Sequence, residues 1–192
     1  MIDHPKNVSR AETVDHPESL APPEPPNDAS VAAMWREVLA LFGEAPETTR
    51  RPLDAWHFSD NRADADALVE LVLAGRKRAT APSQPFFLLS GTPQPEPGHL
   101  SVVTDGSGIA RCVLRTTRVD VVPYHAVDAE FAAVEGEGDG SLAYWRSVHW
   151  PYYERELAPY GVAPRSDLPI VCERFEVVYP LEAAHRLGVR VP

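Results

Sequence analysis

Apolar positions recur at helical spacing in two segments of the first half of the chain. The first segment begins with Ser30, a suitable N-cap, and ends at Gly43, a common helix stop. The second begins at Ser59 or Asp60 and ends at Gly75. Both patterns predict amphipathic helices whose apolar face packs on a core. These faces contain Val31, Met34, Trp35, Val38, Leu39 and Phe42 in the first segment, and Leu68, Val69, Val72 and Leu73 in the second.

The middle of the chain has the pattern of β-strands. Segments 99–104 and 109–122 alternate or run apolar on either side of a turn at 105–108, which predicts a hairpin, and segment 170–179 predicts a closing strand. Helices are expected over 127–134 and over 141–157, the second either continuous or broken at Pro151, and the five prolines between positions 82 and 97 predict a loop. Because strands and helices do not alternate regularly, we expect an α+β barrel-type domain rather than a doubly wound sheet.

The first 29 residues differ in composition from the rest. They hold six prolines among acidic and small polar residues, with almost no large apolar side chain, and such a segment cannot bury enough surface to become ordered. We therefore expect a disordered proline-rich tail over 1–29, a folded domain over 30–180 that includes the first helix, and a C-terminal extension over 181–192.

The charge, hydropathy and cysteine content of the chain limit which classes of function are expected. The net charge of −10 argues against a broad basic surface for long nucleic acids, so extended DNA binding is not expected. No apolar run approaches the roughly 18 residues of a membrane helix, and the N-terminus lacks an apolar leader, which predicts a cytoplasmic protein without membrane contact. Cys112 and Cys172 form neither a disulfide framework nor a CxxC pair, and both are expected in the core.

Lysine is almost absent from this chain. Sixteen of the eighteen basic residues are Arg, and Lys77 is the only lysine after Lys6. It lies in the stretch LAGRKRAT, directly after the second predicted helix. One interpretation is that these cations stabilise the negative end of the helix dipole. The other is that Arg76 and Lys77 face a pocket near Thr80, where a lysine with a lowered pKa accepts the proton of a nucleophilic hydroxyl.

The acidic loop EGEGDG offers a second candidate group. Its carboxylates at Glu135, Glu137 and Asp139 alternate as in the first half of an EF-hand, but the twelfth position is Arg146 where a bidentate carboxylate is required. The seven histidines lack zinc spacing, and no nucleotide-binding glycine motif occurs, so neither a metal site nor a cofactor is expected. The loop is either solvated, or it directs one carboxylate, Glu137, into a site as an acid or base.

Aromatic residues are concentrated between positions 145 and 153. Bases stack on aromatic faces in RNA-binding proteins, but aromatic residues at helical spacing more often belong to a core. Both interpretations remain open at this point. The residues are Trp145, His149, Trp150, Tyr152 and Tyr153.

Several of these motifs together resemble the ASCH domain family. The resemblance spans roughly residues 31–180, and its motifs occur in the expected order: WHFSD at 56–60, LVLAGRKRAT, SVVTDGSG, EFAAVEGEGDGSLAYWRSVHW and PIVCERFEVVY. It implies a PUA-like fold, a small β-barrel with flanking helices, in a superfamily associated with RNA. Compared with compact members, this chain has an additional N-terminal helix and a longer helical excursion.

The resemblance also implies a site beside GRKRAT. In bacterial relatives that hydrolyse the acetyl amide of N4-acetylcytidine, a Lys, a Thr three residues later and a Glu from an acidic loop act together. Lys77, Thr80 and Glu137 match that pattern, the last with a different loop length. The substrate-binding residues expected beside them are Arg76, Arg78, Asp60 and Trp145.

Two functions are consistent with this site. The first is hydrolysis of a modified pyrimidine nucleoside, with Thr80 as nucleophile, Lys77 as its activator and Glu137 as proton shuttle to the leaving amine. The second is RNA binding or ribonuclease activity, in which Arg76, Lys77 and Arg78 hold phosphates and aromatic residues stack bases. The partner is thus a modified nucleoside or RNA, and the oligomeric state is left open.

Overall fold

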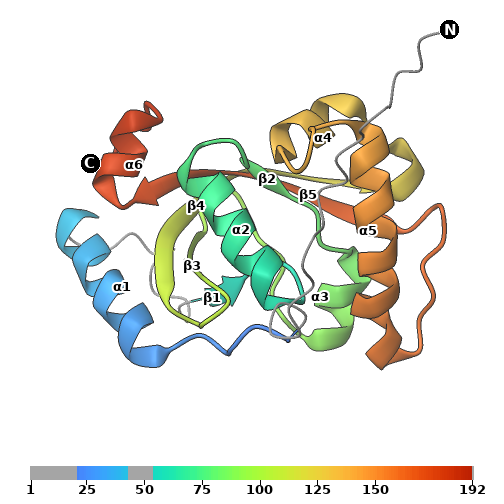
Figure 1. The fold of residues 1–192 in the computed structure, drawn as a ribbon, viewed down its shortest axis with the longest axis horizontal. Coiled ribbons are helices and arrows are strands. Elements are labelled where there is room, and N and C mark those ends of the chain that lie inside the picture. The colour runs from blue at the N-terminus through green and yellow to red at the C-terminus, as the bar shows by residue number, and fades with distance from the viewer. Residues whose placement is uncertain (1–20, 43–53, 192) are drawn as a thin grey trace, which may run out of the picture.

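The computed structural model describes residues 21–42 and 54–191, which form a mixed sheet with helices packed around it (Figure 1). The strands are β1 (Asp54–His57), β2 (Ala79–Thr80), β3 (Leu100–Thr104), β4 (Ala110–Pro123) and β5 (Pro169–Tyr179). The helices are α1 (Asp28–Phe42), α2 (Arg62–Leu73), α3 (Gln84–Ser90), α4 (Ala129–Glu135), α5 (Leu142–Leu157) and α6 (Leu181–Arg186), with 3-10 turns at Tyr124–Ala126 and Ala158–Tyr160.

The sheet has the order β1-β3-β4-β5-β2. The long β4 and β5 pair antiparallel along most of their length, β3 joins β4 as a hairpin, β1 runs parallel to β3, and the short β2 lies antiparallel to β5. The α+β class with flanking helices is therefore confirmed. The sheet is not closed into a barrel, since no pairing joins β1 to β2 among the described residues.

Three helices cover the sheet with the apolar faces that the sequence pattern indicates. Each contributes to a separate cluster of buried side chains: α1 through Val31 and Val38, α2 through Val69 and Val72, and α5 through Trp145, Tyr153 and Leu157. Figure 1 shows α2 crossing one face of the sheet, with α4 and α5 together beside the β2 end. The spacing of apolar residues thus determines which helix face is buried.

Most of the predicted elements are present, with shifted ends. The hairpin of β3 and β4 lies where it was predicted, and β5 begins one residue earlier. Helix α1 begins at Asp28 because Asn27, rather than Ser30, caps it, and α2 is capped by Asn61, whose side chain accepts from the Asp64 N–H. Short polar side chains close to a helix start compete for the cap, so the pattern predicts the helix better than its first residue.

One local prediction was wrong. The proline-rich stretch expected to be a loop contains α3, because Ser83 caps it and Pro85 lies in its first turn, where the missing N–H has no helical partner. Of the two alternatives for the helix over 141–157, the structure shows the continuous one, because α5 runs through Pro151. Both cysteines are buried and free, as predicted.

The segment before α1 lies along the hairpin. Backbone N–H groups of Glu24 and Asn27 donate to the carbonyls of Gly106 and Gly108, and the N–H of Arg62 donates to the carbonyl of Ala21. Residues 21–27, assigned above to the tail, therefore have defined partners, whereas the disorder predicted for 1–20 lies outside the described residues. Within the described part of the chain, no helix combines the length and apolarity that crossing a membrane requires.

Candidate functional site

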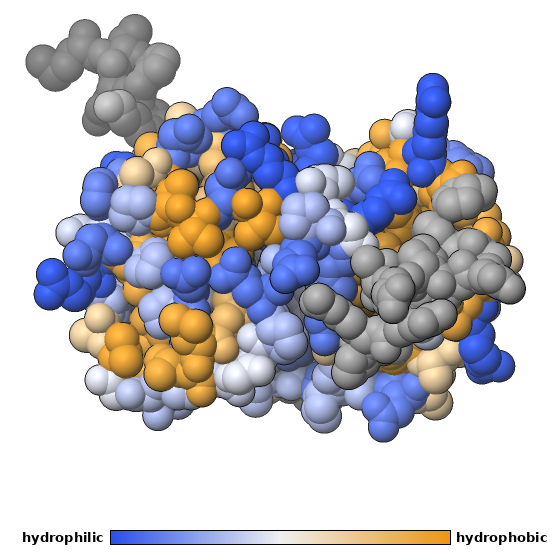
Figure 2. Space-filling model, turned by 180° about the vertical axis from the view of Figure 1, so that it is seen from behind, coloured by the Kyte–Doolittle hydropathy of each residue, from blue (hydrophilic) through white to orange (hydrophobic). Residues whose placement is uncertain are grey.

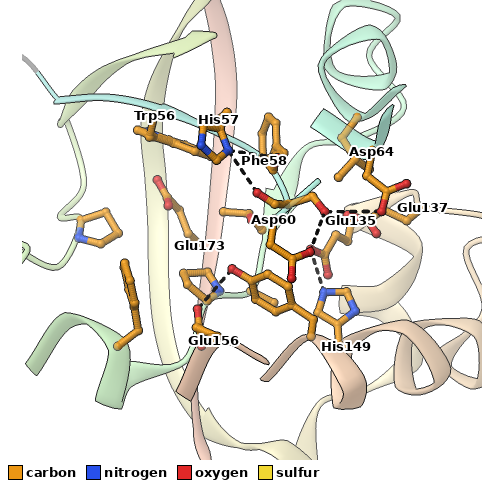
Figure 3. A pocket seen from close by; sticks show the side chains of 18 of the residues that line it. Trp56, His57, Phe58, Asp60, Asp64, Glu135, Glu137, His149, Glu156 and Glu173 are labelled. Atoms are coloured by element: carbon orange, nitrogen blue, oxygen red, sulfur yellow. Dashed lines mark hydrogen bonds and ion pairs between the residues drawn. The ribbon is translucent and has the colours of Figure 1, made fainter. Parts of the chain in front are cut away.

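A pocket of about 820 Å³ opens between α2, α3, α5 and the edge of the sheet. Strand β1 supplies Trp56 and His57 to its wall, β2 supplies Thr80, and β5 supplies Glu173 (Figure 3). Aromatic side chains make up much of the remaining wall. They are Phe58, Phe86, Phe87, Tyr144 and Tyr152.

Lys77 reaches this site from the turn that ends α2. The backbone N–H groups of Arg76 and Lys77 both donate to the Leu71 carbonyl, so the chain turns sharply after the helix. Gly136 then packs on this turn with a φ of 70°, and a Cβ at this position would lie 2.2 Å from the Arg76 carbonyl oxygen. Only glycine combines this close approach with a positive φ at low cost, and it brings the two neighbouring glutamates against Lys77.

A cluster of charged and aromatic side chains forms at the pocket wall, which Glu135, Glu137 and His149 line. The Lys77 ammonium donates to Glu135 Oε1 at 3.1 Å and to Glu137 Oε1 at 2.5 Å, and it lies 5.1 Å from the centroid of the Phe58 ring. Trp145 Nε1 donates to the second oxygen of Glu135 at 2.5 Å, and His149 Nε2 lies 3.4 Å from Glu135 Oε1. We call these residues, Lys77, Glu135, Glu137, Trp145 and His149, the lysine cluster.

The electrostatics of the lysine cluster favour its charged forms. Burial by itself lowers the pKa of Lys77, but the carboxylates of Glu135 and Glu137 outweigh it and raise that pKa. Burial likewise opposes ionisation of Glu135, but Lys77 and His149 lower the pKa of this carboxyl to about 2. His149 has a raised pKa because the neighbouring carboxylates outweigh its burial. The condition stated above for Lys77 as a base, a lowered pKa, is therefore not met.

Three members of the cluster have the geometry of a metal site. One ligand atom each from Glu135, Glu137 and His149 lies within 4.8 Å of the other two. The Lys77 ammonium already binds both carboxylates, so a metal ion here would have to compete with a fully buried cation. The donor set fits a divalent ion only after that displacement.

The predicted site residues divide into two groups. Thr80, Glu137 and Asp60 line the pocket, and Asp60 is held by two contacts from Arg155 at 2.5 and 3.1 Å. Lys77 is 1% exposed and reaches the pocket through Glu137.

The other predicted binding residues do not line the pocket. Arg76 and Arg78 are exposed outside it, and Arg76 donates to the Gly138 carbonyl. Trp145 is 2% exposed and stacks on His149 at 4.3 Å between ring centroids. Because the indole is buried and donates to Glu135, it positions this carboxylate and offers no free face for a base.

Two carboxyl groups of the pocket had no signal in the sequence. Glu173 is 7% exposed and accepts from Thr116 Oγ1 at 2.6 Å, and Glu156 accepts from Tyr152 Oη at 3.2 Å. Burial raises the pKa of both, although these hydrogen bonds act in the opposite direction. An acid in a strand or on an amphipathic helix normally marks the solvent face, so the pattern alone assigns both to the surface.

The pocket wall carries far more negative than positive groups. Arg155 is the only Lys or Arg among the described lining residues, and its guanidinium is paired with Asp60. A phosphate would therefore meet repulsion here rather than a cation. The acidic lining residues are Asp54, Asp60, Asp64, Glu135, Glu137, Glu156 and Glu173.

The outer surface near the pocket is partly apolar. Figure 2, which shows the molecule from behind, has apolar side chains gathered in patches on one half of that face. Leu88 and Leu89 of α3 are 77% and 46% exposed, directly after Phe86 and Phe87 of the pocket wall. Helix α3 thus lies between the pocket and solvent.

Comparison with known proteins assigns the family. The ASCH domain model matches residues 54–179, and no curated protein matches the chain. The crystal structure of an ASCH domain from Lactobacillus crispatus is 30% identical, with a TM-score of 0.70, over 78% of this chain and 94% of that one. A protein from Enterococcus faecalis is 31% identical, with a TM-score of 0.68, over 78% and 88% of the two chains. The chain therefore belongs to the ASCH domain family.

Proposed function

We propose that this protein is a hydrolase that removes the acyl group from an N4-acylated pyrimidine nucleoside such as N4-acetylcytidine. The observation that carries the proposal is the hydroxyl of Thr80, which lines the pocket and makes no hydrogen bond with any described residue. Glu137 lines the same pocket and is held by the buried Lys77. A free hydroxyl in the same pocket as a carboxylate that is paired with an amine supports acyl transfer.

The reaction proceeds through an ester on the protein. Thr80 Oγ attacks the carbonyl carbon of the acyl group, a C–O bond forms, and the C–N bond to the base breaks. The leaving nitrogen gains a proton and departs as the amino group of cytidine. Water then cleaves the acyl ester, releases the carboxylic acid and restores the Thr80 hydroxyl.

Lys77 acts as a proton donor in this scheme. Because its pKa is raised by Glu135 and Glu137, the lysine enters the reaction as an ammonium. Its proton passes to the departing nitrogen through Glu137, which contacts Lys77, lines the pocket and is more exposed than Glu135. The other oxygen of Glu135 is bound by Trp145, so this residue positions the lysine and takes no direct part.

The pocket wall favours an unphosphorylated nucleoside. Its aromatic side chains offer flat apolar surface to a base, and its carboxylates offer acceptors to N–H and O–H donors. The surplus of carboxylates over the single paired Arg155 repels phosphate groups. A free nucleoside therefore fits the lining better than a nucleotide inside an RNA strand.

Incubation of the purified protein with N4-acetylcytidine, followed by chromatography of released cytidine, tests the proposal. We expect turnover in the wild type, loss of about 10²-fold or more in Thr80→Val, and a loss of similar size in Lys77→Arg, which keeps the charge but cannot release a proton. Absence of turnover in the folded wild type, or unchanged rates in both variants, would defeat the assignment.

RNA binding on the outer surface is a second candidate. Arg76 and Arg78 are exposed, and neither forms an ion pair with a described residue, so both are available to phosphates. This function predicts RNA affinity that falls as salt rises and weakens in Arg76→Ala and Arg78→Ala. If RNA affinity is absent, or does not change with salt concentration, RNA binding is excluded as a function of this surface.

A further inference from the structure

Glu173 lies opposite Thr80 in the sheet. In the antiparallel pairing of β2 with β5, Thr80 is the Cα partner of Glu173. Residues directly opposite each other in an antiparallel pair project to the same face, with Cβ atoms about 5 Å apart. Both side chains line the pocket, so the register places a carboxyl group beside the free hydroxyl.

The carboxyl group of Glu173 is anchored at one oxygen and free at the other. Thr116 Oγ1 donates to Oε1 at 2.6 Å, whereas Oε2 has no hydrogen-bond partner among the described residues. In Figure 3, Glu173 lies on the side of the pocket that Trp56 lines, apart from Glu137 and His149. Thr116 thus fixes the orientation of a carboxyl group whose second oxygen is available for chemistry.

Among the described residues, Glu173 has no cationic partner. None of the described Lys, Arg or His side chains forms an ion pair with it, although it is 7% exposed. A buried carboxylate without a partner is costly, and burial raises the pKa of Glu173 toward the range in which a carboxylate is an effective base. Glu137, in contrast, is bound to an ammonium.

We propose that Glu173 is a further catalytic residue, the general base that takes the proton from Thr80 Oγ. The inference rests on the proposed function. Each of the two proton transfers then has its own group: Glu173 activates the nucleophile, and the Lys77–Glu137 pair protonates the leaving nitrogen. An acid and a base in contrasting environments are the usual basis for such a division.

The protons balance over a full cycle. In the first half, the Thr80 proton moves to Glu173 as the C–O bond forms, and a proton from Lys77 moves through Glu137 to the leaving nitrogen as the C–N bond breaks. In the second half, water attacks the ester and gives a proton back to Lys77 through Glu137. The Thr80 oxygen leaves the acyl carbon and recovers its proton from Glu173.

The pH dependence of kcat and KM for N4-acetylcytidine in Glu173→Gln tests this role. We expect kcat to fall about 10²-fold or more, KM to change little, and the acidic limb of the wild-type profile to disappear. Glu173→Asp should recover part of kcat, and Glu182→Gln, the same change on the exposed side of α6, should match the wild type. An unchanged kcat, or an effect on KM alone, would overturn the inference.

Acetylation of Thr80 by p-nitrophenyl acetate, followed by mass spectrometry, separates this inference from the choice of substrate. We expect Glu173→Gln to slow acetylation of Thr80 at least 10-fold. If this holds while N4-acetylcytidine is not hydrolysed, the nucleoside assignment fails and the role of Glu173 stands. If Thr80 is not acetylated, or reacts equally fast in Glu173→Gln, the role of Glu173 is refuted.

Discussion

Glu135 and Glu173 are two glutamates of one pocket with opposite electrostatics. They are 1% and 7% exposed, so both lose most of their contact with water. Lys77 and His149 lower the pKa of Glu135 to about 2 despite its burial, whereas burial without a cation raises the pKa of Glu173. The difference shows that the charged partner, and not the depth of burial, decides the state of each carboxyl group.

The charges of Glu135 and Glu173 also have opposite effects on stability. Glu135 belongs to the lysine cluster, in which carboxylates, ammonium and indole satisfy one another, so its charge supports the fold. Within the described part of the chain, Glu173 has one hydroxyl partner and no cation, so its charge costs stability at neutral pH. Residues that cost stability and face a pocket are candidates for chemistry.

Removal of the Lys77 ammonium should have the largest effect on stability. In Lys77→Met, the buried carboxylate of Glu135 and the partly buried one of Glu137 lose their counterion, and we expect a loss of about 3–5 kcal/mol in the free energy of unfolding at pH 7. Chemical denaturation measures it, with the exposed Arg78→Met as control, for which a change within about 0.5 kcal/mol is expected. Addition of Glu135→Gln to Lys77→Met should recover part of the loss. No recovery would mean that the lysine stabilises the fold by packing rather than by charge.

Lowering the pH should reduce the free energy of unfolding because Glu135 becomes protonated. Its folded-state pKa of about 2 lies below the ordinary value of 4.5, so its stabilising contribution is present above about pH 4.5 and is lost as pH falls toward 2. The size is about 3 kcal/mol. Unfolding free energies of wild type and Glu135→Gln, measured between pH 7 and pH 2, should converge at the acid end. Parallel curves would contradict the pairing of Glu135 with Lys77.

Neutralisation of Glu173 should stabilise the protein. A carboxyl with a raised pKa costs stability above its folded-state pKa, and the cost is relieved as pH falls. Glu173→Gln keeps the shape and the acceptor for Thr116, so we expect a gain of about 1 kcal/mol at pH 8 that shrinks toward pH 5. Denaturant midpoints at the two pH values measure it. A loss of stability at pH 8 would show that the carboxylate is compensated.

The smallest effect is expected from the imidazole of the lysine cluster. His149 has a raised pKa, so its charged form stabilises the fold below the ordinary value of 6.5, and this contribution is lost as pH rises through the folded-state pKa. His149→Phe keeps the stacking on Trp145 and should cost about 1 kcal/mol at pH 6, with a smaller difference at pH 9. An equal cost at both pH values would assign the role of His149 to packing.

Much of the fold follows from local sequence patterns. Helices α1 and α2 and the β3–β4 hairpin were predicted because their apolar spacing reflects which face is buried. Helix α3 was missed because proline discourages helices in general but is tolerated in a first turn. The lone lysine and its closeness to Thr80 in the sequence indicated a candidate site, and Thr80 and Glu137 of that site do line the pocket.

The sequence by itself determined most of the helices and the three longer strands, and it indicated Lys77, Thr80 and an acidic loop as candidate site residues. Only the tertiary structure decided which groups each carboxylate lies next to. Glu135 and Glu137 lie on either side of Gly136, whose positive φ turns the backbone between them. Glu173 lies opposite Thr80 only because of the register between β2 and β5. Register and burial depend on contacts between residues far apart in the chain, and these contacts set the charge state of each group.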